Sequence, residues 1–365
     1  SAGCGTNQII NLALENPNWT IHGIDLSEAS IDFVHKQIKK YDLKNVTAEV
    51  KDIFDIDYKN EFDFVISTGV IHHTKQPKEA LIKLVDATNS SGALHIMVYA
   101  SYGRRGVYDI QKIMKYLDVQ QDEEGINLVR NYIENGPEDL PERKRYNAKT
   151  DKYDAGIIDT YLNPQDVAYD ATDIEELIDG TGAYFQNWYD NLFLYPQEYL
   201  RYLNIDPKKF NKLNPFESAD LTQRHLGQAN KFDFILRKNK KFEFLWHDIK
   251  DIKNETIVKN GFYLGVASGT DWGSDFGGQL YYKAHGDLKS IPFNLQEGIV
   301  WSCIIEGIKE SDNQSGVKVS SLLSMSKSMA KEKKLELVFT DKIIKEILHK
   351  MWKISLIRFT GKVDG

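Results

Sequence analysis

The stretch Ser1-Ala-Gly-Cys-Gly-Thr-Asn-Gln8, followed by Gly23-Ile-Asp-Leu-Ser27, decides how this sequence folds. Gly3 and Gly5 flank Cys4 just ahead of residues 9–16. The apolar side chains of residues 9–16 have the spacing of a helix. Glycine is needed where the backbone takes a positive φ or where a ligand approaches it closely. The stretch therefore predicts a tight turn into a helix, with a carboxylate, Asp25, at the end of the next strand.

Strands and helices alternate along the first hundred residues. This alternation predicts an α/β fold with a parallel sheet covered by helices on both faces. The predicted strands are 20–24, 46–50, 62–66 and 93–99, with a turn at 89–92, and the predicted helices are 9–16, 27–38 and 78–87.

No apolar strand stands ahead of the glycine turn. We therefore expect that the first strand of the sheet is missing and that the sequence is a fragment. A native start after processing is the alternative, but it leaves the turn with no strand before it.

The rest of the sequence divides near residue 240. We expect one domain over 1–239, with a polar helical insert or lid at about 103–165, and a smaller α+β domain over 240–365. Further helices are expected at 106–117, 172–178, 320–330 and 343–351, and strands at 183–189, 232–237, 261–267, 278–282, 298–305, 335–339 and 354–359.

Composition excludes several classes of protein. Of 365 residues, 41% are hydrophobic and 27% charged, with a net charge of −7, which argues against disorder and against a polyanion-binding protein as a whole. Cys4 and Cys303 are the only two cysteines, too few for a disulfide framework or a multi-cysteine zinc site, and we expect a cytoplasmic protein. No apolar run reaches about 18 residues, so no membrane partner is expected.

The residues around the turn suit a nucleoside. A carboxylate about 20 residues after a glycine loop is placed to accept hydrogen bonds from ribose hydroxyls. A dinucleotide fingerprint requires a third glycine where Gln8 stands, and no Walker lysine is present. NAD and ATP are therefore disfavoured as ligands.

Five motifs in register carry a family resemblance. Ala2-Gly-Cys-Gly-Thr6, Gly23-Ile-Asp-Leu-Ser27, Asp52, residues 62–73 and Ser90-Ser-Gly-Ala93 resemble those of class I (Rossmann-like) S-adenosylmethionine-dependent methyltransferases. The resemblance covers residues 1 to about 100 and can be followed to about 237. It implies a Rossmann-like fold, with S-adenosylmethionine as the cofactor. The family commonly has a third glycine where Asn7 stands, and asparagine tolerates that backbone conformation.

The resemblance also implies the cofactor-binding residues. Asp25 would bind the ribose, although a charge at a helix N-terminus is an alternative role, and Asp52 would face the adenine unless it is simply a solvent-exposed carboxylate. The full set is Ala2, Gly3, Cys4, Gly5, Asp25, Leu26, Asp52, Ile53, Ser67, Thr68 and Gly69.

His73 and Tyr99 are the candidate catalytic residues. A base is needed only if the acceptor loses a proton, and histidine has a pKa in the right range. A packed residue beneath the cofactor is an equal alternative for His73 and the favoured one for His72. Arg104 and Arg105 would hold an anionic acceptor or cap the lid. No metal site is expected, because no carboxylate or cysteine lies at ligand spacing from the histidines.

The C-terminal residues Gly261–Gly265 and Asp275–Tyr282 faintly resemble the catalytic domain of tRNA-splicing endonucleases. Tyr282 and Lys331 or Lys334 match that family's set, but its histidine has no counterpart, and nuclease activity is not expected. RNA remains a candidate partner of this part. The sequence predicts a methyltransferase acting on a small-molecule acceptor; the alternative is a cofactor-binding or RNA-associated module without turnover.

Overall fold

The computed structural model describes residues 1–140, 142–143, 153–163, 165–189, 196, 200, 203, 205–227, 229–238, 249, 252–260, 270–271, 279–284, 287–310, 316–353 and 356–360. The chain divides into two compact units, Ser1–Tyr189 with Asn214–Glu243 and Asp190–Leu213 with Phe244–Gly365. This division differs from the expected one chiefly at residues 190–213, which group with the second unit.

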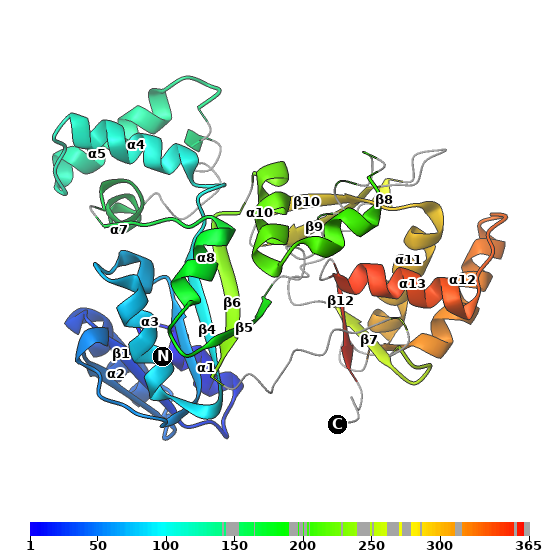
Figure 1. The fold of residues 1–365 in the computed structure, drawn as a ribbon, viewed down its shortest axis with the longest axis horizontal. Helices are drawn as coiled ribbons and strands as arrows, with labels where there is room; N and C mark the ends of the chain where they lie inside the picture. The colour runs from blue at the N-terminus through cyan, green and yellow to red at the C-terminus, as the bar shows by residue number, and fades with distance from the viewer. Residues whose placement is uncertain are drawn as a thin grey trace. The chain divides into compact units, whose positions relative to one another are not determined.

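The first unit is a Rossmann-like α/β structure built on two adjoining sheets (Figure 1). One sheet pairs β1 (Ile21–Asp25) with β2 (Val46–Val50) in parallel. The other has the order β3-β4-β6-β5, where β3 and β4 are parallel and β6 is antiparallel to both of its neighbours. Its strands are β3 (Phe62–Thr68), β4 (Thr88–Tyr99), β5 (Tyr184–Trp188) and β6 (Lys231–Arg237). The sheet is thus mixed rather than wholly parallel.

Ser1 and Ala2 join the two sheets. Ala2 forms a parallel bridge with Ile24 of β1, and its N–H donates to the Ile66 carbonyl of β3 at 2.8 Å. The combined order is therefore β2, β1, Ser1–Ala2, β3, β4, β6, β5. Only these two residues fill the central place, where the missing first strand was expected.

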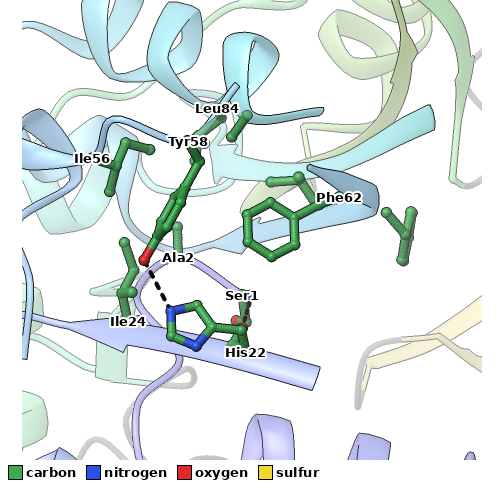
Figure 2. Close-up of a pocket in the computed structure, with 11 residues that line it drawn as sticks. Ser1, Ala2, His22, Ile24, Ile56, Tyr58, Phe62 and Leu84 are labelled. Atoms are coloured by element: carbon green, nitrogen blue, oxygen red, sulfur yellow. Dashed lines mark hydrogen bonds between the residues drawn. The ribbon is translucent and has the colours of Figure 1, made fainter. Parts of the chain in front are cut away.

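A pocket lies beside this junction (Figure 2). Figure 2 shows His22 of β1, Phe62 of β3 and Tyr58 around it, with Ser1 and Ala2 at its edge. The His22 and Phe62 rings stack with centroids 6.3 Å apart, and His22 Nε2 lies 3.1 Å from the Tyr58 hydroxyl. The two sheets thus leave room between β1 and β3 beside the short bridge.

Amphipathic helices pack on these strands. Ile9, Ile31, Val34 and Leu81 are among their buried apolar residues, as the helical spacing predicted. The helices are α1 (Gln8–Glu15), α2 (Glu28–Lys40), α3 (Pro77–Ala87), α8 (Ala171–Ile178) and α10 (Pro215–Leu226), with the 3₁₀ turns η1 (Ile53–Asp55) and η2 (Ile71–His73). Ser27 caps α2, because its hydroxyl accepts from the Ser30 N–H at 3.2 Å.

The insert has a small core of its own, formed by residues such as Val107, Val129 and Tyr161. Its elements are α4 (Arg105–Tyr116), α5 (Glu123–Asn135), α7 (Asp154–Ile157) and the π-helical η4 (Ile158–Leu162). Within its described residues, the expected insert is therefore mainly helical.

The second unit has a separate core around Trp301, Leu322 and Leu348. Its described elements are η7 (Pro207–Lys212), the strands β7 (Ile257–Asn260), β8 (Thr270–Asp271), β9 (Gln279–Ala284), β10 (Asp287–Pro292), β11 (Val317–Lys318) and β12 (Ile357–Thr360), and the helices α11 (Leu295–Glu310), α12 (Val319–Glu332) and α13 (Asp341–Lys353). The strands form two antiparallel sheets, β10-β9-β8 and β11-β7-β12.

Three local predictions were wrong. Residues 298–305 belong to helix α11, not to a strand; the helix is buried on most sides, and burial all round removes the periodicity that separates helix from strand. Residues 335–339 alternate in burial like a strand but form no sheet pairing. The predicted turn at 89–92 lies inside β4, where Asn89 Oδ1 accepts from the Ser91 N–H at 3.0 Å.

Two other calls, the strand at 261–267 and the linker 239–241, lie outside the described residues. The endonuclease-like segments 261–265 and 275–278 lie there too. Among the helices that the structure does describe, none combines the length and apolar character needed to cross a bilayer.

Candidate functional site

The glycine turn is built from two residues with positive φ, Gly3 at 68° and Gly5 at 54°. A methyl group added at Gly3 would lie 2.2 Å from Val70 Cγ2, so Gly3 is required by packing. A methyl group at Gly5 would meet nothing within 4 Å. Gly5 therefore exposes its backbone to open space, as a ligand that approaches the chain requires.

Asp25 lies directly against this turn. Its Oδ2 accepts from the Gly5 N–H at 2.8 Å and its Oδ1 from the Ser27 N–H at 2.9 Å. No space separates the carboxylate from Gly5, so a ribose would have to use the remaining lone pairs on the outer side. Leu26, the next residue, is 68% exposed.

The other predicted cofactor residues follow neighbouring strands. Asp52 caps η1 by accepting from the Phe54 N–H at 2.9 Å, and Ile53 is buried. Thr68 Oγ1 accepts from Gln8 Nε2 at 2.7 Å, which ties the end of β3 to the start of α1. Gly69 has a φ of 79°.

Besides Ile53, three predicted residues keep their side chains in the interior. Ala2 and Cys4 are buried and would offer a ligand only their backbone; burial raises the pKa of the Cys4 thiol. Ser67 is fully buried, and its hydroxyl has no hydrogen-bond partner within the described part of the chain.

Together these residues fit a nucleoside cofactor. Gly5 leaves open space that a side chain would fill, a carboxylate stands beside it, and an exposed leucine follows. The loops that carry them follow the carboxyl ends of β1, β2 and β3, which is where ligands bind in open α/β sheets.

A cluster of rings follows β3 and β4 on the same edge. The His72 ring centroid lies 4.1 Å from that of His73 and 4.1 Å from that of Tyr99, and the His73 and Tyr99 rings are perpendicular at 5.3 Å. The structure therefore brings the two predicted catalytic residues together, with the His72 ring next to both.

A buried ion pair completes this cluster. Arg104 lies with its guanidinium 3.6 Å above the centre of the Tyr99 ring and donates to Asp166 Oδ2 at 2.9 Å. Both side chains are almost fully buried, 3% and 0% exposed. The charge of Arg104 is thus matched inside the protein, which favours its role at the base of the insert over a role in holding an anionic acceptor.

Asp166 reaches the cluster through backbone pairing. The Val167 N–H donates to the His72 carbonyl at 3.2 Å, and the Tyr169 N–H donates to the Tyr99 carbonyl at 2.9 Å. Sequence reasoning missed Asp166 because more than ninety positions separate it from His72. Spacing along the sequence therefore did not reveal that a carboxylate lies close to the histidines in space.

His72 is fully buried. Burial, together with the electrostatic influence of His73 and Arg104, lowers its pKa to about 2. Neither ring nitrogen has a hydrogen-bond partner among the residues that the structure describes. His72 is thus a neutral imidazole near physiological pH.

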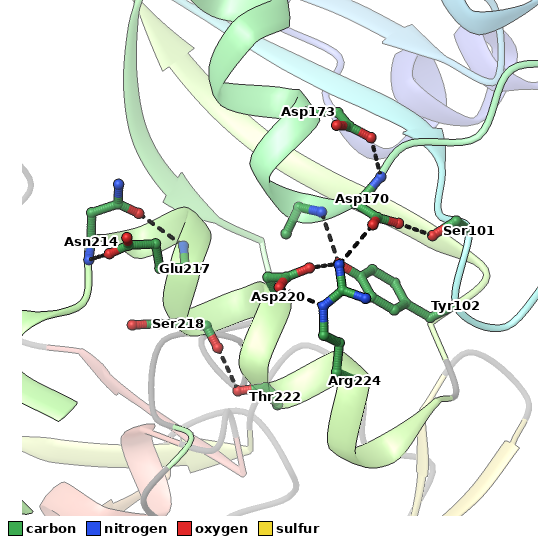
Figure 3. A network of polar contacts seen from close by, with 11 residues as sticks. Ser101, Tyr102, Asp170, Asp173, Asn214, Glu217, Ser218, Asp220, Thr222 and Arg224 are labelled. Carbon is green, nitrogen blue, oxygen red and sulfur yellow. Dashed lines mark hydrogen bonds and ion pairs between the residues drawn. The ribbon is translucent and has the colours of Figure 1, made fainter. Parts of the chain in front are cut away.

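A polar network ties the start of the insert to two helices (Figure 3). Tyr102 donates to Asp220 and accepts from the Ala171 N–H at 3.1 Å, while Arg224 bridges Asp220 at 2.7 Å and Asp170 at 2.9 Å. Burial raises the pKa of Tyr102, so its hydroxyl stays protonated as a donor. The network links the end of β4 to α8 and α10.

Comparison with known proteins identifies the first third of the chain. Residues 2–124 match the sequence profile of a family described as a methyltransferase domain. Two curated relatives, each uncharacterised, are 24% identical: one from Synechococcus sp. over 276 residues, which are 73% of this chain and 66% of the relative, and one from Rickettsia prowazekii over 282 residues, which are 72% and 49%. The chain thus spans between half and two thirds of these relatives.

A solved structure shares the fold over nearly the whole chain. PKMT2 from Rickettsia typhi, solved alone and in complex with AdoHcy, superposes with a TM-score of 0.63 at 13% identity, covering 98% of this chain and 70% of PKMT2. The glycine turn, the carboxylate behind it and the matched profile agree. Residues 2–124 of this chain therefore match a methyltransferase domain, within a chain that shares the fold of PKMT2.

Proposed function

We propose that the protein transfers a methyl group from S-adenosylmethionine to a small-molecule acceptor. The observation that carries this proposal is the contact between Gly5 and Asp25, at 2.8 Å, with open space beside Gly5. A carboxylate held by two backbone N–H groups is ordered in advance for ribose hydroxyls, so little ordering is left for binding.

The cofactor residues have distinct proposed roles. Gly3, Gly5, Ala2 and Cys4 form the backbone floor, and Asp25 accepts from the ribose. Leu26, Asp52 and Ile53 face the adenine, and Ser67, Thr68 and Gly69 lie beside the reactive end. When bound, S-adenosylmethionine supplies a methyl group already activated by a positively charged sulfur.

His73 and Tyr99 are the proposed catalytic pair. Their perpendicular rings at 5.3 Å lie on the same edge of the sheet as the glycine turn. Positioning supplies much of the rate of a displacement between two bound groups, and these side chains orient the acceptor and accept its proton where it carries one.

The enclosure of the ring cluster favours a small acceptor over RNA. His72 is fully buried and Arg104 nearly so, and the stretch with Asp166 and Val167 pairs across the cluster. RNA binding through the second unit, like the cytoplasmic location, stays a prediction from the sequence.

The test uses cofactor labelled on its methyl group. Incubation of the protein with a cell extract should place label in the low-mass filtrate, and little in protein or RNA. Tyr99→Phe should reduce the rate about 10- to 100-fold through loss of the hydroxyl, whereas Tyr116→Phe, at a 75% exposed tyrosine, should leave it unchanged.

Label in the RNA or protein fraction alone would contradict the small-molecule acceptor. Tight cofactor binding with no labelled product in any fraction would contradict turnover and favour a binding module.

A further inference from the structure

His72, His73 and Asp166 share a feature that methyl transfer does not require. One potential ligand atom from each residue lies within 4.8 Å of the other two. Both ring nitrogens of His72 and Oδ1 of Asp166 are buried without a hydrogen-bond partner within the described ranges. An unsatisfied buried polar atom costs about 1–3 kcal/mol, and one ion that binds a single His72 ring nitrogen and Asp166 Oδ1 would satisfy two of these three atoms.

The residue types match a known kind of metal site. Two histidines and one carboxylate are the protein ligands of many catalytic zinc sites, in which a further position stays open to water or substrate. Bonds of about 2.0–2.2 Å in tetrahedral geometry place ligand atoms roughly 3.4 Å apart. The present spread of 4.8 Å is therefore within reach of small side-chain rotations.

Neighbouring groups form hydrogen bonds to these side chains, as the groups that orient metal ligands do. Arg104 at 2.9 Å and Gln111 at 3.3 Å both donate to Asp166 Oδ2, which leaves Oδ1 for an ion. Nδ1 of His73 lies 3.2 Å from the Gln165 carbonyl oxygen and 3.3 Å from the amide nitrogen Nδ2 of Asn163. In the tautomer whose Nδ1–H donates to that carbonyl, Nε2 keeps the lone pair that a metal requires.

The charge of Arg104 decides which ion suits the cluster. The guanidinium already balances the Asp166 carboxylate, so the ligand set as a whole is neutral. Magnesium and calcium depend on charged oxygen ligands, whereas zinc binds neutral imidazole well. The cluster therefore favours zinc.

We propose that His72, His73 and Asp166 bind one Zn²⁺ ion beside Tyr99, with an open coordination position for the acceptor. An acceptor oxygen, nitrogen or sulfur on the ion would lose its proton more readily. His73 would then contact the acceptor through the ion rather than directly.

The experiment measures metal binding without turnover. The full untagged chain is stripped with a chelator, and Zn²⁺ is added during calorimetry; Co²⁺ is used in parallel for its visible absorption. We expect one equivalent of each ion and no competition from Mg²⁺. His73→Asn and Asp166→Asn should each weaken binding by at least about 10–100-fold, whereas His35→Asn, at an exposed histidine, should not.

Two results would contradict the zinc site. Absence of stoichiometric Zn²⁺ binding, or binding that His73→Asn and Asp166→Asn leave intact in folded protein, would overturn the proposal. Far-UV circular dichroism establishes that each variant is folded, and His73, which is only partly buried, remains informative if Asp166→Asn unfolds. Cofactor binding, measured separately, keeps this outcome distinct from that of the methyl-transfer proposal.

Discussion

The proposed cofactor side of the first unit is held by backbone hydrogen bonds, whereas the proposed acceptor side is held by buried side chains. On the cofactor side, Gly5 and Ser27 donate N–H groups to Asp25, all within 27 residues. On the proposed acceptor side, the Arg104 guanidinium lies over the Tyr99 ring and donates to Asp166, which is 62 positions away in the sequence. A local motif thus specifies the first region, and the whole fold is needed to assemble the second.

The largest loss of stability is expected when the buried ion pair between Arg104 and Asp166 is broken. Arg104→Met leaves the Asp166 carboxylate buried without its partner, and removal of one member of a buried pair costs about 3–5 kcal/mol. Urea unfolding monitored by fluorescence should show this loss.

Arg105→Met is the matched control, since this neighbouring arginine is exposed. Its effect should stay within about 0.5 kcal/mol. Equal effects of the two variants would mean that the Arg104–Asp166 pair does not hold the acceptor side together.

The two glycines separate packing from ligand access on the cofactor side. Gly3→Ala combines a positive φ with a clash against Val70 and should cost about 2–4 kcal/mol of unfolding free energy. Gly5→Ala meets no atom within 4 Å, so it should cost only about 1–2 kcal/mol, for its φ, yet weaken cofactor binding.

Urea unfolding and a cofactor titration on the same two proteins check this pair. If Gly5→Ala bound S-adenosylmethionine as tightly as the parent protein, the open space beside Gly5 would not be the cofactor site.

The parts predictable from sequence were those with a local signal. The strand that ends at Asp25, the helix that follows it and the alternation of elements to Tyr99 follow from short-range patterns, and the structure has each of them. Asp166 carried no such signal, because its place depends on pairing with His72 and Tyr99.

Helix α11 does have a start signal in the sequence, at Asn294 and Glu297. Asn294 and Glu297 form reciprocal contacts, with the Glu297 N–H donating to Asn294 Oδ1 at 2.8 Å and the Asn294 N–H donating to Glu297 Oε2 at 2.9 Å. An asparagine followed three positions later by a glutamate marks a helix start. The apolar run that follows is buried on most sides, which hid the helical period.

The most direct measurement of the central claim is an S-adenosylmethionine titration of Asp25→Asn, with Asp32→Asn, at an exposed position on α2, as the control. Asparagine offers one acceptor oxygen in place of two and carries no charge, so we predict a loss of affinity of about 10–100-fold for Asp25→Asn and none for Asp32→Asn. Unchanged affinity in a folded Asp25→Asn protein would contradict the assignment of this carboxylate, and of the hollow beside Gly5, to the cofactor.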